Sequence, residues 1–278
     1  MNRSRRPSLR ASACLVLTAL AVTALAACGD EESQELAYTL SGDGKTAKLE
    51  GPSSADSGLT EISFENSSGG EADLQLIRVE GERSPAETAD GLKSASNGRP
   101  FPEWFFAGGG TGATPAGETK TVTQVLEPGT YYAFEVEGGL DPKSAVRLDV
   151  GGEASDEELA ADATVSAFEY GFESDGLASG STEVAFENTG VQPHHIVYAP
   201  LNEGATAEDV ESFFKTEKGK PPFNDEDFRS TAVIEGGEAQ LVDLDLEPGR
   251  YALLCFISDR EGGPPHAFKG MIDEVEVE

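Results

Sequence analysis

Short segments that alternate between polar and apolar residues, separated by turn residues, fill most of the chain. Residues 183–186 alternate in this way, which predicts a strand with one buried face. The segment 251–257 is apolar at every position, which predicts a strand in the middle of a sheet. The Thr206-x-x-Asp209 pattern instead resembles a helix cap, and an apolar i, i+3, i+4 stripe follows it at Val210, Phe213 and Phe214, which predicts a helix.

Two blocks of sequence occur twice in the same order. Residues 58–66 recur at 180–188 with six of nine positions identical, and residues 126–131 recur at 246–251 with five of six identical. Two blocks that recur in the same order at nearly the same separation predict two homologous domains. Short strands, long crossovers and helical insertions predict an all-β fold of two tandem Greek-key β-sandwiches, each with a short helical insertion.

The predicted domains span residues 36–152 and 164–278, with a linker at 153–163. The linker is rich in small and acidic residues, and its Ser155-x-x-Glu158 pattern predicts the start of a short helix.

The N-terminal 27 residues predict a signal peptide, because an arginine-rich start precedes a short apolar run. The run ends in Leu25-Ala26-Ala27-Cys28, which resembles a bacterial lipobox. Cys28 is therefore the predicted lipidation site, and residues 28–35 the tether of a protein anchored at the outer face of the cytoplasmic membrane. The alternative is an ordinary cleaved signal. The arginine pair also resembles a twin-arginine motif, so the export route stays open.

Charge excludes some partners. The chain has 51 acidic and 20 basic side chains, a net charge of −31; without the four arginines of residues 1–27, 16 − 51 gives −35. Nucleic-acid phosphates would be repelled. A basic protein partner would be attracted, although a solvated acidic surface without a partner explains the charge equally well.

The rare side chains that bind metals gather in the second repeat. With Cys14 and Cys28 in the N-terminal segment, Cys255 has no disulfide partner in the mature chain. The same repeat holds every histidine and the one remaining methionine of the mature chain: His194, His195, His266 and Met271. Two imidazoles, a thiolate and a thioether are the ligands of a mononuclear blue copper site. Zinc fits less well, because a thioether is a poor zinc ligand.

These residues resemble the pattern of the cupredoxin family, the blue copper proteins related to plastocyanin and azurin. Residues 188–197 are similar to the family's first histidine segment, and 246–271 to its segment with Cys, His and Met. The resemblance implies one type 1 copper held by His194, Cys255, His266 and Met271 for electron transfer with a redox partner protein. It also implies that His195 and Asn188 orient the ligands.

Two departures accompany the resemblance. Ten residues separate Cys255 from His266, more than in small cupredoxins, and residues 258–265 predict an exposed turn that leaves the copper accessible or forms a docking surface. In the first repeat, Ala72, Asp73 and Glu135 occupy the positions of His194, His195 and Cys255. That repeat is therefore a degenerate cupredoxin-like domain without this site.

Two further functions remain compatible with the sequence. The residues could serve a copper store or chaperone, or the site could be vestigial in a copper-free binding or adhesion module. Catalysis is not predicted: no third member joins a Cys255–His266 pair, and three histidines are too few for a multicopper oxidase. The glycine run 108–110 lacks the residues of a phosphate loop and predicts a flexible turn.

Overall fold

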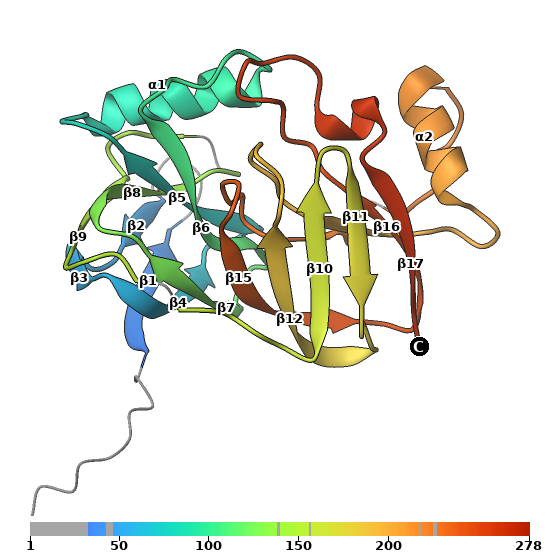
Figure 1. The fold of residues 1–278 in the computed structure, drawn as a ribbon, viewed down its shortest axis with the longest axis horizontal. Helices are drawn as coiled ribbons and strands as arrows, with labels where there is room; N and C mark the ends of the chain where they lie inside the picture. The colour runs from blue at the N-terminus through green and yellow to red at the C-terminus, as the bar shows by residue number, and fades with distance from the viewer. Residues whose placement is uncertain (1–32, 43–46, 138–139, 156, 217, 225–226) are drawn as a thin grey trace, which may run out of the picture. The chain divides into compact units, whose positions relative to one another are not determined.

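A computed structural model describes residues 33–278, except 43–46, 138–139, 156, 217 and 225–226. Two helices and seventeen strands make up the regular structure of the described residues, together with short 3₁₀ turns (Figure 1). The predicted signal peptide and Cys28 lie outside the described part of the chain. No helix within that part is long and apolar enough to span a bilayer.

The first repeat forms a sandwich of two sheets, drawn from blue to green in Figure 1. One sheet contains β1 (Gln34–Ser41), β2 (Lys48–Glu50), β4 (Gly58–Ser67) and β7 (Thr119–Leu126). The other contains β3 (Ser54–Asp56), β5 (Ala72–Val79), β6 (Phe105–Thr114), β8 (Gly129–Glu135) and β9 (Val146–Gly151).

The second repeat has the same arrangement, drawn from yellow to red. One sheet contains β10 (Ala163–Phe168), β11 (Gly171–Asp175), β12 (Gly180–Asn188) and β15 (Ala239–Leu246). The other contains β13 (Val197–Pro200), β14 (Arg229–Ser230), β16 (Gly249–Leu254) and β17 (Ile272–Val277). The predicted tandem sandwiches are confirmed.

One sheet is continuous through both repeats. β15 pairs antiparallel with β7, with Val242 opposite Val122, so the strand order is β11-β10-β12-β15-β7-β4-β1-β2. The main hydrophobic core contains residues of both repeats. The predicted boundary at 152 directly follows β9, whereas the one at 164 falls on the second residue of β10, and β1 begins inside the predicted tether.

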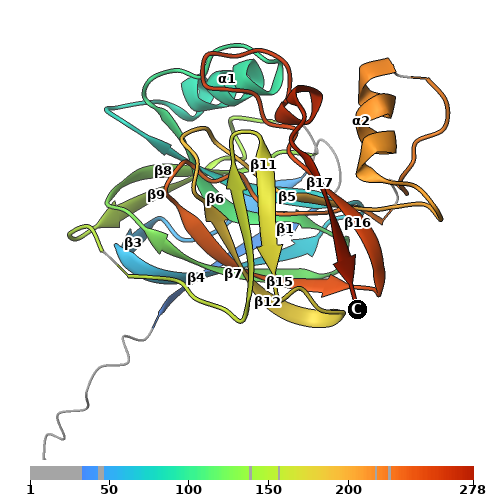
Figure 2. The same ribbon diagram turned by 45° about the vertical axis from the view of Figure 1, so that its right-hand side comes forward.

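In each repeat a helix covers the outer face of the sheet that is not part of the continuous one (Figures 1 and 2). α1 (Pro85–Ser96) begins with a capping box between Ser84 and Glu87. α2 (Ala207–Thr216) is the helix predicted from the apolar stripe, and Val210 buries that stripe against β13 and β16. Long crossovers thus provide both helical insertions.

Three sequence expectations about local structure are wrong. Described residues around 155–158 form no helix, because the Ser155 hydroxyl bonds the Glu157 carboxylate instead of capping a backbone. Glycines 108–110 lie inside β6, not in a turn. A Cβ at Gly110 would stand 2.2 Å from the Leu74 carbonyl, so the close approach of β5 requires glycine there. The apolar strand also ends at Leu254, one residue before Cys255.

Candidate metal centre

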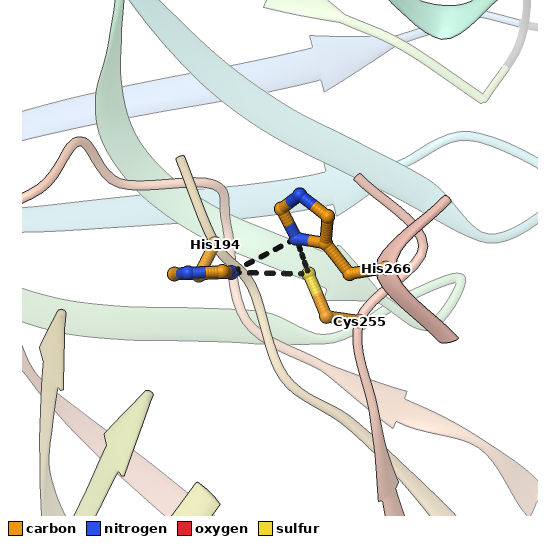
Figure 3. Close-up of side chains that lie close together, drawn as sticks. All are labelled: His194, Cys255 and His266. Atoms are coloured by element: carbon orange, nitrogen blue, oxygen red, sulfur yellow. Dashed lines mark hydrogen bonds between the residues drawn. The ribbon is translucent and has the colours of Figure 1, made fainter. Parts of the chain in front are cut away.

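Three of the predicted ligands come together from segments just outside the strands of the second repeat. Cys255 follows the end of β16, His194 lies in the segment before β13, and His266 begins a 3₁₀ turn, His266–Lys269. The sulfur lies 3.6 Å from His194 Nδ1 and 3.5 Å from His266 Nδ1, and the two nitrogens are 3.1 Å apart (Figure 3). All three side chains are fully buried.

These separations fit a single metal ion. A metal about 2.0 Å from each nitrogen and about 2.3 Å from the sulfur leaves N–S separations of about 3.5 to 3.7 Å. The same geometry leaves an N–N separation of about 3.3 to 3.5 Å, close to the 3.1 Å between the two Nδ1 atoms. Two imidazoles and one thiolate in this arrangement are compatible with one type 1 copper site.

The protonation states suit metal binding. Burial, together with the neighbouring His266 ring, lowers the pKa of His194 to about 4. Burial also lowers the pKa of His266, against the opposing effect of Asp259. Both rings are therefore neutral at pH 7 and offer a lone pair. Burial raises the pKa of the Cys255 thiol to about 12, so a bound cation must displace its proton.

Met271 is fully buried and directly precedes β17. Its backbone N–H donates to the His266 carbonyl at 3.0 Å, which closes the turn. Gly270 before it has φ = 100°, a left-handed conformation that favours glycine. The turn therefore fixes Met271 close in sequence and space to His266, and its part as an axial ligand stays a prediction.

Asn188 and His195 act on the segments that carry the ligands. The Asn188 amide donates to the carbonyls of Gln192 and Ile234, at 2.8 and 3.1 Å, and so fixes the loop before His194. His195 Nε2 accepts the N–H of Phe256 at 3.0 Å, next to Cys255. The backbone N–H groups of His195 and Ile257 also donate to the Cys255 sulfur, which lowers the pKa of the thiol, although burial raises it more.

A carboxylate faces the outer nitrogen of each candidate imidazole ligand. These two carboxylates were not predicted from the sequence. His266 Nε2 lies 3.0 Å from Asp259 Oδ1, and His194 Nε2 lies 3.5 Å from Glu169 Oε1. Tyr170 also donates to Asp259 Oδ1, at 2.9 Å, and packs its ring 5.2 Å from that of His266. Lys269 pairs with the other oxygen of Asp259. The one sequence feature that could have indicated Asp259 is the presence of an acid in the long insertion between Cys255 and His266. Only the fold shows that this acid reaches His266.

The long insertion is not an exposed turn, which corrects the sequence expectation. Arg260 donates to Glu235 and to the Phe105 carbonyl, both at 2.8 Å, and its own carbonyl accepts the Phe101 N–H. Gly263 donates to the carbonyl of Gly98 after α1, and both ribbon views place this red loop beside the end of that helix (Figures 1 and 2). Glu261, Gly263 and Pro264 remain exposed, but packing on the first repeat closes the loop over His266.

The described residues of the first repeat bring no comparable ligands together. The metal-ligand arrangement found among the described residues is His194, Cys255 and His266. Ala72 and Glu135 stand at the equivalent positions in β5 and β8, and Asp73 is equivalent to His195. The aromatic residues 101–106 pack with α1 and β5 or contact arginines, as expected of core and interface residues.

No protein-family model matches the sequence, and no curated protein matches it. Solved structures similar to the chain include an auracyanin from Roseiflexus castenholzii, 20% identical over 41% of this chain and 94% of that one, with a TM-score of 0.28. An azurin from Methylomonas sp. strain J is 17% identical over 44% of this chain and 100% of that one, with a TM-score of 0.30. A multicopper oxidase is 12% identical over 88% of each chain, with a TM-score of 0.24.

Auracyanin and azurin are cupredoxins, the family that the second repeat resembles. The sheets of the described residues make the chain an all-β protein of two tandem sandwiches. Its second sandwich contains one buried group of two histidines and a cysteine compatible with type 1 copper.

Proposed function

We propose that the protein is a lipid-anchored, extracytoplasmic electron carrier with one type 1 copper bound by His194, Cys255 and His266. Met271 would be the fourth residue to hold the copper. The observation that carries the proposal is the fully buried triangle of two Nδ1 atoms and one Sγ, with ligand separations between 3.1 and 3.6 Å. Copper at this site would supply reversible one-electron chemistry.

The protein's own residues hold the ligands in place. Asn188 fixes the loop before His194, and the N–H of Ile257 donates to the Cys255 sulfur. Asp259 bonds the outer nitrogen of His266, which fixes the ring orientation and its tautomer. Because these contacts fix the ligands through the protein's own hydrogen bonds, the ligands would need little rearrangement between oxidation states.

Burial of the site favours electron transfer over catalysis. His194, Cys255 and His266 have no exposed surface, so a substrate has no direct path to a metal between them. The three large hydrophobic residues exposed in the described part of the chain are close to the ligands in sequence or space: Tyr170 at 37%, Val191 at 74% and Phe268 at 41%. Tyr170 packs on His266, so this apolar group is the proposed contact surface for a redox partner protein.

The location follows from the N-terminal sequence. A signal peptide ending in a lipobox would place a lipid on Cys28 and leave the two sandwiches outside the cytoplasmic membrane. Anchoring of this kind would hold the carrier near membrane-bound redox partners.

Copper loading of the mature chain tests the function. We expect one copper per chain, an intense visible thiolate-to-copper band, and reversible oxidation and reduction. A matched pair is Cys255→Ser, which should abolish the band, and Cys28→Ser, which should leave it unchanged in the soluble protein. A colourless chain that takes up no stoichiometric copper would contradict the proposal. Copper that binds only as Cu(I) and passes to acceptors without redox cycling would favour a store.

A further inference from the structure

A cavity of about 510 Å³ lies between the first repeat and the segment that follows Cys255. β5, α1 and β6 of the first repeat provide one part of the wall, and residues 256–265 of the second repeat provide another. Its volume is in the range of small-molecule sites. Most of the wall is apolar, with Ile77, Leu92, Phe101, Phe105, Val136 and Phe256 among the lining side chains.

Asp73 is the one ionisable residue among those that line the cavity. Its Oδ1 is buried and has no hydrogen-bond partner among the described residues. Burial raises the pKa of Asp73 to about 7, which reflects the loss of water around the carboxyl group. A buried acceptor without a donor costs free energy, and a ligand that provides the donor would recover it.

The charges around Asp73 favour a cationic donor. Glu71, Glu135 and Glu137 add negative potential at Asp73, and Lys120 is the opposing base. The Lys120 ammonium is itself engaged, since it donates to the carbonyls of Ala113 and Ser230 at 3.3 and 2.8 Å. It does not line the cavity.

The aromatic side chains suit an aromatic ligand. Phe101, Phe105 and Phe256 come from three different segments of the wall, and Phe101 and Phe105 pack edge to face with centroids 5.9 Å apart. Phenyl faces attract both aromatic edges and cations. The cavity therefore combines a large apolar volume with one anionic anchor.

We propose that this cavity binds a small monoamine, with an aromatic or similarly apolar body in the Phe-lined space and its ammonium group paired with Asp73. The proposal goes beyond electron transfer and does not depend on copper. Phe256 directly follows Cys255 and Pro265 directly precedes His266, so the ligand would contact the segment that carries two candidate metal ligands.

The test uses the metal-free mature chain and three probes with the same phenyl body. These are 2-phenylethylamine, the neutral 2-phenylethanol and the anionic phenylacetate, at about pH 8, where Asp73 with a pKa of about 7 is ionised. Trp104 is the single tryptophan, and its ring lies 6.2 Å from that of Phe105 in the cavity wall. Its fluorescence therefore reports occupancy, and calorimetry gives the stoichiometry.

We expect saturable 1:1 binding of the amine, binding of the alcohol weaker by about tenfold or more, and no binding of phenylacetate. Asp73→Asn should weaken amine binding by about tenfold or more. Asp90→Asn removes the same charge from an exposed position on α1 and should change nothing. Ala95→Leu, which fills the cavity at a lining position, should block the amine while the melting transition shows the chain folded.

Equal affinity for the amine and phenylacetate would overturn the proposal, as would full amine binding by folded Asp73→Asn or no binding to the wild type. Because the chain is metal-free, these outcomes are independent of copper loading. A chain that binds the amine but no copper would refute the proposed electron carrier alone.

Discussion

The two repeats share their hydrogen-bond framework but differ in what they place inside it. Asn66 donates to the carbonyls of Gly70 and Thr114, as Asn188 donates to those of Gln192 and Ile234. Tyr131 bonds the Glu127 carbonyl at 3.0 Å, and Tyr251 bonds that of Glu247 at 2.9 Å. The framework therefore does not require the ligands. Asn188 serves the sandwich as well as the site, because its counterpart does so where no ligands exist.

The difference begins at the residue after the strand-end position. In the second repeat the N–H of Phe256 donates to the His195 side chain. In the first repeat the N–H of Val136 donates to the backbone carbonyl of Asp73, and one oxygen of the Asp73 side chain has no partner in the described part of the chain. One repeat thus uses this position to support a candidate metal ligand. The other leaves a carboxyl group at the wall of a cavity.

The largest expected effect is the loss of copper when the Cys255 thiol is removed. A substitution of Glu135, the equivalent residue of the first repeat, is the matched control. Cys255→Ser should reduce copper uptake from one ion per chain to less than about 0.1, because the soft ligand is lost. Glu135→Gln changes the equivalent position and should leave uptake unchanged. Metal analysis and the visible spectrum measure both. Loss of copper in the Glu135 variant would mean that the first repeat takes part in the site.

Arg260→Ala tests whether contacts with the first repeat stabilise the loop between Cys255 and His266. The change removes the ion pair with Glu235 and the hydrogen bond to Phe105 across the repeats. We expect the free energy of unfolding to fall by about 2 to 3 kcal/mol, since Glu235 keeps a half-satisfied buried charge. Denaturant titration measures this. Arg229→Ala, at an exposed arginine of β14, should cost less than about 0.5 kcal/mol. Equal small losses would mean that the loop is held by its backbone contacts.

Glu118 and Glu238 occupy equivalent positions in the two repeats but differ in burial. They should therefore differ in their effect on the pH dependence of the free energy of unfolding. Burial raises the pKa of Glu238 from 4.5 to about 7, while Glu118 is exposed. Between these pH values the folded chain binds more protons at Glu238 than the unfolded chain, so stability falls as pH rises through this window. Glu238→Gln should therefore gain about 1 to 2 kcal/mol at pH 8 and nothing near pH 4.

Glu118→Gln is the control and should show no such gain. Denaturant titrations at several pH values measure both variants. A gain for Glu238→Gln that is equal at all pH values would contradict the assignment to burial of its charge.

The smallest effect concerns the carboxylate on His266, for which the first repeat has no counterpart. Its negative charge favours the more positive oxidation state of a bound copper, and Lys269 offsets part of that charge. Asp259→Asn should raise the reduction potential by about 30 to 60 mV, a tenfold change or less in the redox equilibrium. Voltammetry measures this, with Asp243→Asn, an exposed acid on β15, as the control. A lower potential in the Asp259 variant would refute the proposed electrostatic role.

The repeat spacing and the alternation of apolar residues were enough to predict the sandwiches, and the stripe ending in Phe214 predicted α2. Ligand candidates could be named because the sequence has so few histidines, cysteines and methionines. The environment of His266 could not, since Asp259 reaches it through a loop whose path is set by Gly98 and Phe105 of the other repeat. The glycine strand β6 was also missed, because its requirement for glycine comes from the neighbouring β5 backbone. Contacts between segments distant in sequence leave no local pattern.

The pairing of β7 with β15 has the symmetry of a dimer made within one chain. Val122 and Val242 occupy the same position in their repeats and face each other across antiparallel strands, as equivalent residues do at a two-fold interface. Between separate molecules such an interface would dissociate on dilution. Linked in one polypeptide, the halves meet at an effective concentration in roughly the millimolar range. The contacts by which the first repeat stabilises the loop between Cys255 and His266 are therefore independent of the protein concentration.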